Sequence, residues 1–261
     1  MINKSNLIKF GSATIASFFI ASCDGGSDNI TESDNITEDR TSISFTATIE
    51  ASGPIGFSDG LLFFHDGNFD LFDNGSSLSD QLIPFAEQGS SGPLIGTSLL
   101  ADVGIENLRP FREIPPGSFN PGSSNPESLI SVVTVENRFP GYFAQVLPSN
   151  DTFIGNDNPL ELDLYQALLD SPDGTVTIEV TQLYDAGTEV NDFLTSNGNE
   201  FIAGLPEPEG GLEAGEDENG VITLHTPTFY DEFLNPGDFD VSTINPEGTV
   251  VARITFTIEE Q

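Results

Sequence analysis

Apolar and polar residues alternate with a period of two along several segments of this chain. The alternation is clearest over residues 43–49, 175–183 and 250–258, where Thr, Ser, Glu, Gln or Arg separate the apolar side chains. It is typical of strands with one face in a core and the other in water. Residues 160–164 (LELDL) alternate in the same way, so we expect a strand there too.

Apolar runs without alternation predict four further strands. A strand that is covered on both faces carries apolar side chains on both, so its sequence reads as a continuous apolar run. We expect central strands at residues 129–135 and 142–147, and shorter strands at 61–64 and 221–224.

One segment has a helical pattern. Over residues 77–87, Leu78, Leu82 and Ala86 fall on one face, but Pro84 interrupts the pattern and predicts a short or broken helix. About eight strands joined by long loops, without alternating helices, predict an all-β fold. The expected architecture is an antiparallel β-sandwich with at most one short helix.

The N-terminal segment predicts export. Residues 1–22 carry Lys4 and Lys9, followed by a run of 13 apolar and small residues. This run is too short for a membrane span of roughly 20 residues and is typical of a signal peptide. It ends in Ile-Ala-Ser-Cys23, which resembles a bacterial lipobox, whose cysteine becomes the lipidated first residue of the mature protein. The alternative is an ordinary signal peptide followed by a chance cysteine.

The segment after Cys23 predicts a tether. Residues 24–40 are acidic and poor in apolar residues, and the hexamer SDNITE occurs twice in them. Such a composition cannot support a packed core. We therefore expect a signal peptide at 1–22, a lipidated cysteine with a disordered tether at 23–40, and one domain at 41–261. The predicted location is the cell envelope, at the outer membrane, the cell surface or the periplasmic face.

The net charge of the chain limits the kinds of partner that it can bind. It has 42 Asp and Glu residues against 7 Lys and Arg, a formal net charge of −35, and both lysines lie in the predicted leader. No basic patch remains to displace counterions from phosphates, which excludes nucleic-acid binding. The same charge disfavours docking on anionic lipid, so membrane contact is expected only through the lipid anchor.

Few residues suit nucleophilic catalysis or zinc binding. The only cysteine is Cys23, and the only imidazoles are His65 and His225. We interpret both histidines as structural residues at strand ends, because they lie far apart in the chain and form no H-x-x-x-H pair.

Two acidic segments are interpreted as polar surface. Asp66, Asn68 and Asp70 have the spacing of the first three ligands of an EF-hand loop, but Leu71 stands where that loop needs Gly. We reject the EF-hand and expect a polar turn. Residues 206–220 are rich in Glu, Asp and Gly, and we expect a mobile, solvated loop there.

Three other acids closely follow predicted strands. Asp151 lies just beyond the strand at 142–147, and Asp185 and Glu189 lie just beyond the strand at 175–183. If both strands end on the same side of the sandwich, the three carboxylates meet and raise one another's pKa unless a cation binds. Ca²⁺ accepts an irregular cage of oxygen ligands. In the alternative, the acids are turn residues that cap backbone N–H groups.

Four motifs also carry a resemblance to a known family. They are LPSNDTFIG at 147–155, YDAGTE at 184–189, HDGNFDLFDNG at 65–75 and FAEQG at 85–89. Together they resemble the spondin domain, including its bacterial lipoprotein branch, over residues 41–261. The resemblance implies a C2-like antiparallel β-sandwich that binds one Ca²⁺ at one end. The implied ligands are Asp151, Asp185 and the residue at position 189, where Glu189 replaces the family's usual Asp.

The leading hypothesis is an exported, lipid-anchored, Ca²⁺-binding module without catalytic activity. Such a module would mediate adhesion or bind an extracellular protein or glycan. One alternative is a glycoside hydrolase that uses a pair of carboxylates, although the chain has no Trp for sugar stacking. The other alternative is assembly through an exposed edge strand.

Overall fold

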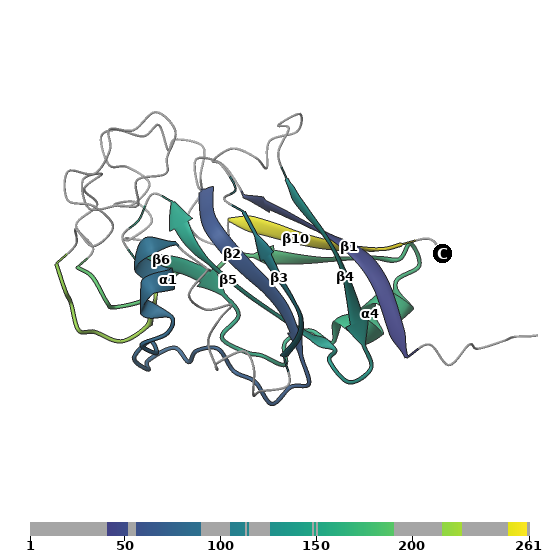
Figure 1. Ribbon diagram of the computed structural model, residues 1–261, viewed down its shortest axis with the longest axis horizontal. Helices are drawn as coiled ribbons and strands as arrows, with labels where there is room; N and C mark the ends of the chain where they lie inside the picture. Colours follow the sequence, from purple (N-terminus) through teal and green to yellow (C-terminus); the bar gives the residue numbers. More distant parts are fainter. Residues whose placement is uncertain are drawn as a thin grey trace, which may run out of the picture. The chain divides into compact units, whose positions relative to one another are not determined.

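The computed structural model describes residues 41–51, 56–89, 105–112, 114, 126–147, 149, 151–190, 216–225 and 250–259. These residues form two antiparallel sheets with a shared core, which confirms the predicted all-β sandwich (Figure 1). Within the described residues there are ten strands, where about eight were expected.

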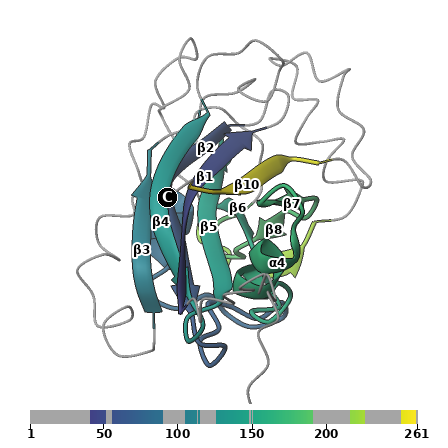
Figure 2. The ribbon, with the colours of Figure 1, turned by 90° about the vertical axis from the view of Figure 1, so that its right-hand side faces the viewer.

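The four-stranded sheet has the order β4-β1-β10-β7. Its strands are β1 (Ser42–Ala51), β4 (Glu127–Thr134), β7 (Thr175–Val180) and β10 (Ala252–Ile258). The six-stranded sheet has the order β3-β2-β5-β6-β8-β9. Its strands are β2 (Gly56–His65), β3 (Ile105–Phe111), β5 (Phe139–Leu147), β6 (Thr152–Gly155), β8 (Tyr184–Asp185) and β9 (Thr223–Leu224). The helices are α1 (Ile83–Gln88) and α4 (Leu164–Asp170), and Figure 2 shows α4 beside β7.

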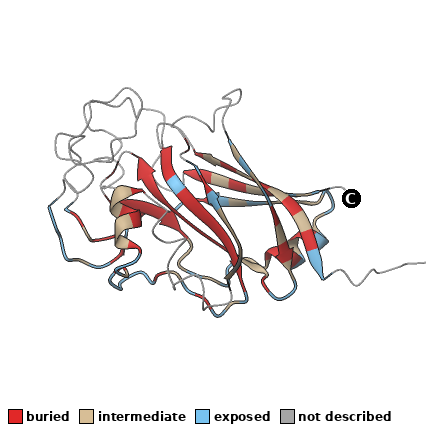
Figure 3. Ribbon diagram, viewed as in Figure 1, coloured by how far each residue is buried: buried red, intermediate tan, exposed pale blue. Residues whose placement is uncertain are grey.

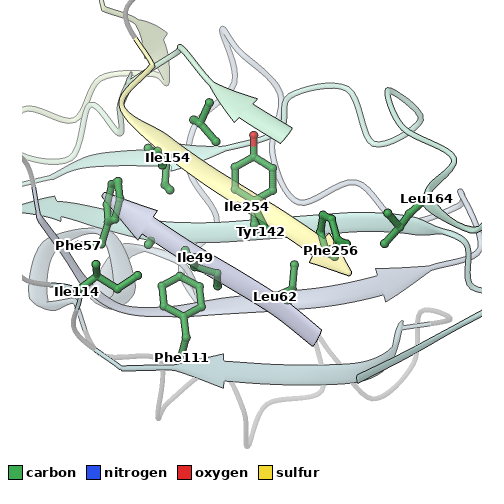
Figure 4. Close-up of a cluster of buried hydrophobic side chains, with 14 of the residues drawn as sticks. Ile49, Phe57, Leu62, Phe111, Ile114, Tyr142, Ile154, Leu164, Ile254 and Phe256 are labelled. Atoms are coloured by element: carbon green, nitrogen blue, oxygen red, sulfur yellow. The ribbon is translucent and has the colours of Figure 1, made fainter. Parts of the chain in front are cut away.

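The main core lies between the two sheets. Every second residue of β1 is buried, as the alternation predicts, because one face of the sheet meets the other sheet and the opposite face meets water. Phe45, Phe64 and Phe256 join the two sheets edge to face, with ring centroids 5.4–6.5 Å apart. Figure 4 shows side chains from both sheets converging in this cluster.

A second apolar cluster covers the outer face of the six-stranded sheet. Phe143 of β5 stacks on Phe153 of β6 at 4.6 Å, and Phe85 of α1 lies 4.8 Å from Phe143. Strands β2 and β5 are therefore buried on both faces, as Figure 3 shows. This confirms the central strand expected at 142–147 and explains why its sequence does not alternate.

The strand expected at 129–135 is found, but its expected central place in the sheet is wrong. This segment forms β4, which is an edge strand, and Ile130 is 70% exposed. The guanidinium of Arg109 in β3 donates from Nε to the Ile130 carbonyl oxygen at 3.1 Å. Because the run contains apolar residues on both faces, its sequence could not reveal that one face remains open.

The strand expected at 160–164 is also wrong. Leu164 begins α4, and Asp163 caps it by accepting a hydrogen bond from the Gln166 N–H at 3.1 Å. Leu164 and Leu168 are buried with helical spacing, while Leu160 is exposed. The described residues therefore hold two short helices, where at most one was expected.

The short helix expected within 77–87 is confirmed as α1. Pro84 falls in its first turn, where the missing N–H would have no helical partner. The strand expected at 221–224 is reduced to the two residues of β9.

Several expectations concern residues outside the described ones. They are the signal peptide at 1–22, the lipidated Cys23, the tether up to residue 40, and residues 206–215 of the acidic stretch. Among the residues that are described, no helix is long and apolar enough to cross a membrane.

Candidate functional site

The pairing of β6 with β8 brings the two acidic motifs together. After β7 the chain leaves the four-stranded sheet and joins the edge of β6, so that Thr152 lies opposite Asp185. The Ala186 N–H donates to the Asp151 carbonyl oxygen at 3.3 Å. Asp151 and Asp185 are therefore neighbours, although the expected reason was different. They meet because β8 adds to β6, and not because two predicted strands end side by side.

Asp151 is a fully buried carboxylate, with 0% of its surface exposed. Its Oδ2 accepts hydrogen bonds from the N–H groups of Thr188 and Glu189, both at 3.0 Å, and from the Thr188 hydroxyl at 3.2 Å. Its Oδ1 is equally buried and has no hydrogen-bond partner among the described residues. One oxygen is saturated with donors and the other has none.

The electrostatic surroundings of Asp151 oppose its ionisation. Burial raises its pKa most, the nearby charge of Asp185 raises it further, and the three hydrogen bonds to Oδ2 lower it. The net result is a pKa of about 7. Three donors to a carboxylate would ordinarily hold its pKa low, so burial and repulsion outweigh them.

Asp185 shapes the turn that follows it. Its Oδ1 accepts the Gly187 N–H at 2.8 Å, and Gly187 has a φ of 67°. A Cβ at position 187 would lie 2.6 Å from the Val221 carbonyl oxygen, so only glycine fits there. This turn brings the N–H groups of Thr188 and Glu189 to Asp151.

The three acids singled out from the sequence thus lie in one neighbourhood. Glu189 is 5% exposed, and its backbone reaches Asp151 directly. The simpler alternative is also visible, because Asp151 and Asp185 both cap backbone N–H groups. Within the part of the chain that the structure describes, no three His, Cys, Asp or Glu side chains are arranged to hold a metal ion. A cation here would therefore also need backbone oxygens or water as ligands.

A fourth acid, Glu218, lies in this neighbourhood and was missed. The stretch 206–220 was expected to be a mobile, solvated loop. Its described residues 216–219 are exposed, and their backbone runs beside the turn at 187–190. The Glu218 N–H donates to the Thr188 carbonyl oxygen at 2.9 Å. Burial and the charge of Asp185 both raise the pKa of Glu218. The composition of the stretch gave no sign of this, because the partner lies 30 residues earlier in the chain.

His225 adjoins the same site. It is 9% exposed, and its Nε2 lies 3.1 Å from the hydroxyl oxygen of Thr152, the residue after Asp151. Burial lowers the pKa of His225 to about 3, so its ring is neutral at ordinary pH. It has the position of the buried strand-end residue that we expected.

The segment that resembles the start of an EF-hand is a polar turn. The two carboxylate oxygens of Asp66 accept from the backbone N–H and from the side-chain amide of Asn68, each at 2.9 Å. His65, the last residue of β2, is buried and accepts the Gly67 N–H on Nδ1 at 3.1 Å. The hydrogen bonds of this turn are therefore closed locally.

A groove opens elsewhere, between β7 and the residues that follow β6. It comprises two adjoining cavities of about 350 and 290 Å³. Both cavities are lined by Tyr142, Asn156, Glu161, Ile178 and Glu179. It is the described feature that bears on the alternative of carboxylate-based hydrolysis.

No protein-family model matches the chain, and no curated protein matches it either. The resemblance to the spondin domain therefore rests on the four motifs and stays a prediction. The arrangement of Asp151, Asp185 and Glu189 is independent of that resemblance, because it comes from the β6–β8 pairing.

Proposed function

We propose that this protein is an exported, lipid-anchored, Ca²⁺-binding β-sandwich module that acts without catalysis. Asp151, Asp185 and Glu189 would hold the ion. The observation that carries the proposal is the one-sided environment of Asp151. Its Oδ2 accepts three hydrogen bonds, while the equally buried Oδ1 accepts none from the residues that the structure describes.

Turn capping alone accounts for only half of this environment. It explains Oδ2, but it leaves Oδ1 buried without a donor and beside a second carboxylate. Burying a charged group without a partner is costly, and the group either takes up a proton or acquires a cation. A divalent ion supported by Asp151 and Asp185 would remove the repulsion between them. Ca²⁺ is the favoured ion because it accepts six to eight oxygens, including carbonyls and water, in irregular geometry.

Glu189 would complete the set of protein carboxylates. It is buried, and its backbone N–H already binds Asp151. The motif resemblance to the spondin domain supports the same three positions. A Glu at position 189 reaches one methylene further than an Asp, so we expect weaker or differently shaped coordination than an Asp would give.

The ion would stiffen one end of the sandwich, where the turn at 185–190 meets the segment at 216–220. Extracellular calcium is abundant, so even a site with a Kd of 10⁻⁴–10⁻³ M would be occupied outside the cell. The stiffened end would present a surface to an extracellular protein or glycan, with the membrane reached only through lipid on Cys23.

A thermal melt of metal-free protein, with and without added calcium, tests the proposal. Calcium should raise the melting temperature of the wild type, because binding adds about 2.7 kcal/mol to the unfolding free energy when free calcium is 100 times the Kd. Asp185→Asn should abolish the rise. Asp170→Asn, at the exposed end of α4, is the matched control and should keep it. The proposal fails if free calcium in large excess over a millimolar Kd leaves the wild-type melting temperature unchanged.

The groove favours a second candidate function, carboxylate-based glycoside hydrolysis. Glu161 and Glu179 line both of its cavities together with Tyr142. If this candidate is right, soluble polysaccharides should release reducing ends, and Glu161→Gln or Glu179→Gln should stop the release. Activity that survives both substitutions would exclude the groove as its source.

Edge-strand assembly remains the third candidate. Exposed Ile130 lies on the edge strand β4, which pairs with no second strand among the described residues. Size-exclusion chromatography with and without chelator tests this candidate, because a monomer under both conditions excludes it.

A further inference from the structure

We infer that the groove beside β7 receives an extended, basic peptide segment of an extracellular partner, which adds as a strand to the open edge of β7. The inference goes beyond the proposed function and does not depend on the calcium site. It also concerns a different edge from the β4 edge of the third candidate.

The groove follows the edge of a strand. Its two cavities are lined by the consecutive residues 177–182, of which 177–180 belong to β7. Successive side chains of a strand point to opposite faces of the sheet, so a groove on one face would be lined by every second residue. Lining by each residue in turn places the groove along the edge. β7 is the last strand of its sheet, and no described strand pairs with this edge (Figure 2).

Alternate residues of β7 direct their backbone groups towards the groove edge. The Gly174 carbonyl oxygen accepts from the Ile258 N–H at 2.9 Å, so the even-numbered residues face β10. Thr175 faces the other way, because its N–H donates to the Ser171 hydroxyl at 3.0 Å and its carbonyl oxygen accepts from that hydroxyl at 2.8 Å. Ser171 thus closes the start of the edge. The outward N–H and C=O groups from Thr177 onwards have no strand partner among the described residues.

The charge of the groove favours a basic occupant. Asp157, Glu161 and Glu179 line it, and its described lining includes no Lys or Arg. Glu179 already forms an ion pair with Arg253. Burial, and after it the charge of Glu161, raises the pKa of Tyr142, so Glu161 lies near the ring that lines both cavities. Glu161 is therefore the acid that a bound cation would meet inside the groove.

The floor of the groove suits the stem of a long basic side chain. Ile178 and Leu162 are partly buried against the main core and line the groove beside Tyr142. A Lys or Arg side chain can lay its aliphatic stem on this floor and place its charge at Glu161.

This chain is itself a poor source of the occupant. It has a formal net charge of −35, and no lysine follows Lys9. The segments 90–104, 191–215 and 226–249 contain no Lys or Arg. A second copy would likewise bring acidic surface against an acidic groove. Complementary charge therefore favours a basic partner over both.

Fluorescence anisotropy with labelled peptides, on the full exported chain in chelator, tests the inference. The probe is a peptide of about eight alternating Lys and Val residues, long enough to span the edge. It should bind, and its counterpart of Glu and Val should not. N-methylation of every second amide should abolish binding in one of its two frames and preserve it in the other, because alternate N–H groups of an added strand face its neighbour. Equal binding in both frames would overturn the inference.

A proline on the strand edge tests the same pairing from the side of the protein. Thr177→Pro removes an outward N–H and no hydrogen bond to β10, so the protein should fold and lose the basic peptide. Thr177→Ala keeps the N–H and is the matched control, which should bind as the wild type does. Thermal melting checks that both variants fold. Unchanged binding by a folded Thr177→Pro variant would contradict strand addition.

Charge variants locate the bound peptide. Glu161→Gln should weaken binding about two- to fivefold, as expected for one exposed ion pair. Glu136→Gln, in the exposed turn between β4 and β5 and outside the groove lining, should leave binding unchanged. Equal weakening by both would mean that the peptide follows net charge and not the groove.

A soluble oligosaccharide that binds in the groove while the peptide does not would assign the groove to a glycan and overturn the inference. Because every measurement is made in chelator, these outcomes are separate from the success or failure of the calcium site.

Discussion

Two acidic turns of this protein look alike in sequence and differ in structure. The turn at Asp66 is exposed, and both oxygens of its carboxylate accept hydrogen bonds from Asn68. These hydrogen bonds, the backbone one first, hold the pKa of Asp66 below its usual value. Asp151 is buried, has a donor-free oxygen and lies beside Asp185, and its pKa is raised to about 7.

The difference shows what makes an acidic turn a candidate for metal binding. Spacing of carboxylates is shared by both turns, and it was the EF-hand-like spacing at Asp66 that looked more regular. Of the two carboxylates, Asp151 is the buried one, and its Oδ1 has no donor among the described residues. An exposed carboxylate with donors on both oxygens has little to gain from a cation, whereas a buried carboxylate with one oxygen lacking a donor has much to gain.

The largest expected effect on stability comes from removing an aromatic side chain that packs next to the Asp151 turn. Phe153 is fully buried beneath the β6–β8 pair and stacks on Phe143 and Tyr184. Phe153→Ala should cost about 3–5 kcal/mol of unfolding free energy and abolish the calcium response, because β6 loses its anchor beside Asp151. Urea denaturation with and without calcium measures both effects.

Phe69→Ala is the matched control for this prediction. Phe69, three residues after Asp66, packs on Phe63 and His65 of β2. The substitution should also lower stability, but the calcium response should remain. A calcium response lost equally in both variants would mean that the two turns are not independent.

Next in size is a pH effect at the histidines beside the two turns. The folded-state pKa of His225 is about 3, well below the unfolded value of about 6.5. The neutral ring therefore contributes stability that is fully present above pH 6.5 and is lost as the pH falls towards 3. At pH 4.5 the loss should be about 3 kcal/mol relative to pH 7, and His225→Gln should show a flatter pH profile.

Proton NMR can compare the two histidines directly. Burial lowers the pKa of His65 as well, but the neighbouring charge of Asp66 opposes that shift. His65 should therefore titrate at higher pH than His225. A His225 ring that titrates near pH 6.5 in the folded protein would contradict its burial beside Thr152.

The third prediction is that the same change, Asp to Asn, has opposite effects on the unfolding free energy in the two turns. Asp151→Asn keeps an oxygen for the Thr188 and Glu189 N–H groups and removes a repelled, buried charge. In metal-free protein at pH 8 it should raise the unfolding free energy by about 2 kcal/mol and remove the calcium response. Thermal melts in chelator give the first value, and melts in calcium give the second.

Asp66→Asn is the smallest effect and completes this comparison. Asp66 is exposed and accepts two hydrogen bonds, so losing its charge should lower stability slightly and leave the calcium response intact. If both substitutions shift the unfolding free energy in the same direction, the proposed difference between the Asp151 and Asp66 carboxylates is wrong.

Much of the fold could be predicted from local patterns. The alternation in β1, β7 and β10 reports one buried face, which is a property of each strand by itself. The predictions failed where contacts with other segments of the chain decide the local structure. Nothing within 129–135 says that β4 lies at an edge, and the short run LELDL at 160–164 fits a strand as well as it fits the approach to a helix.

The site was predicted in part, and for a reason that proved incomplete. Asp151, Asp185 and Glu189 stand out because each lies in a turn rich in Gly, Pro or Asn. Their meeting required the two-residue strand β8, which is too short to carry a periodic signal. Glu218 gave no signal, because its backbone hydrogen bond to Thr188 joins residues far apart in the chain and its exposed side chain resembles the others of an acidic stretch.

The sequence by itself determined the β-sandwich class, the strongly acidic charge and the acids worth examining, because composition and periodicity are set residue by residue. Only the tertiary structure decided which carboxylates become neighbours and which of their oxygens go without a donor. Burial and hydrogen bonding at Asp151 depend on atoms from Thr188 and Glu189, which no local pattern around Asp151 can specify.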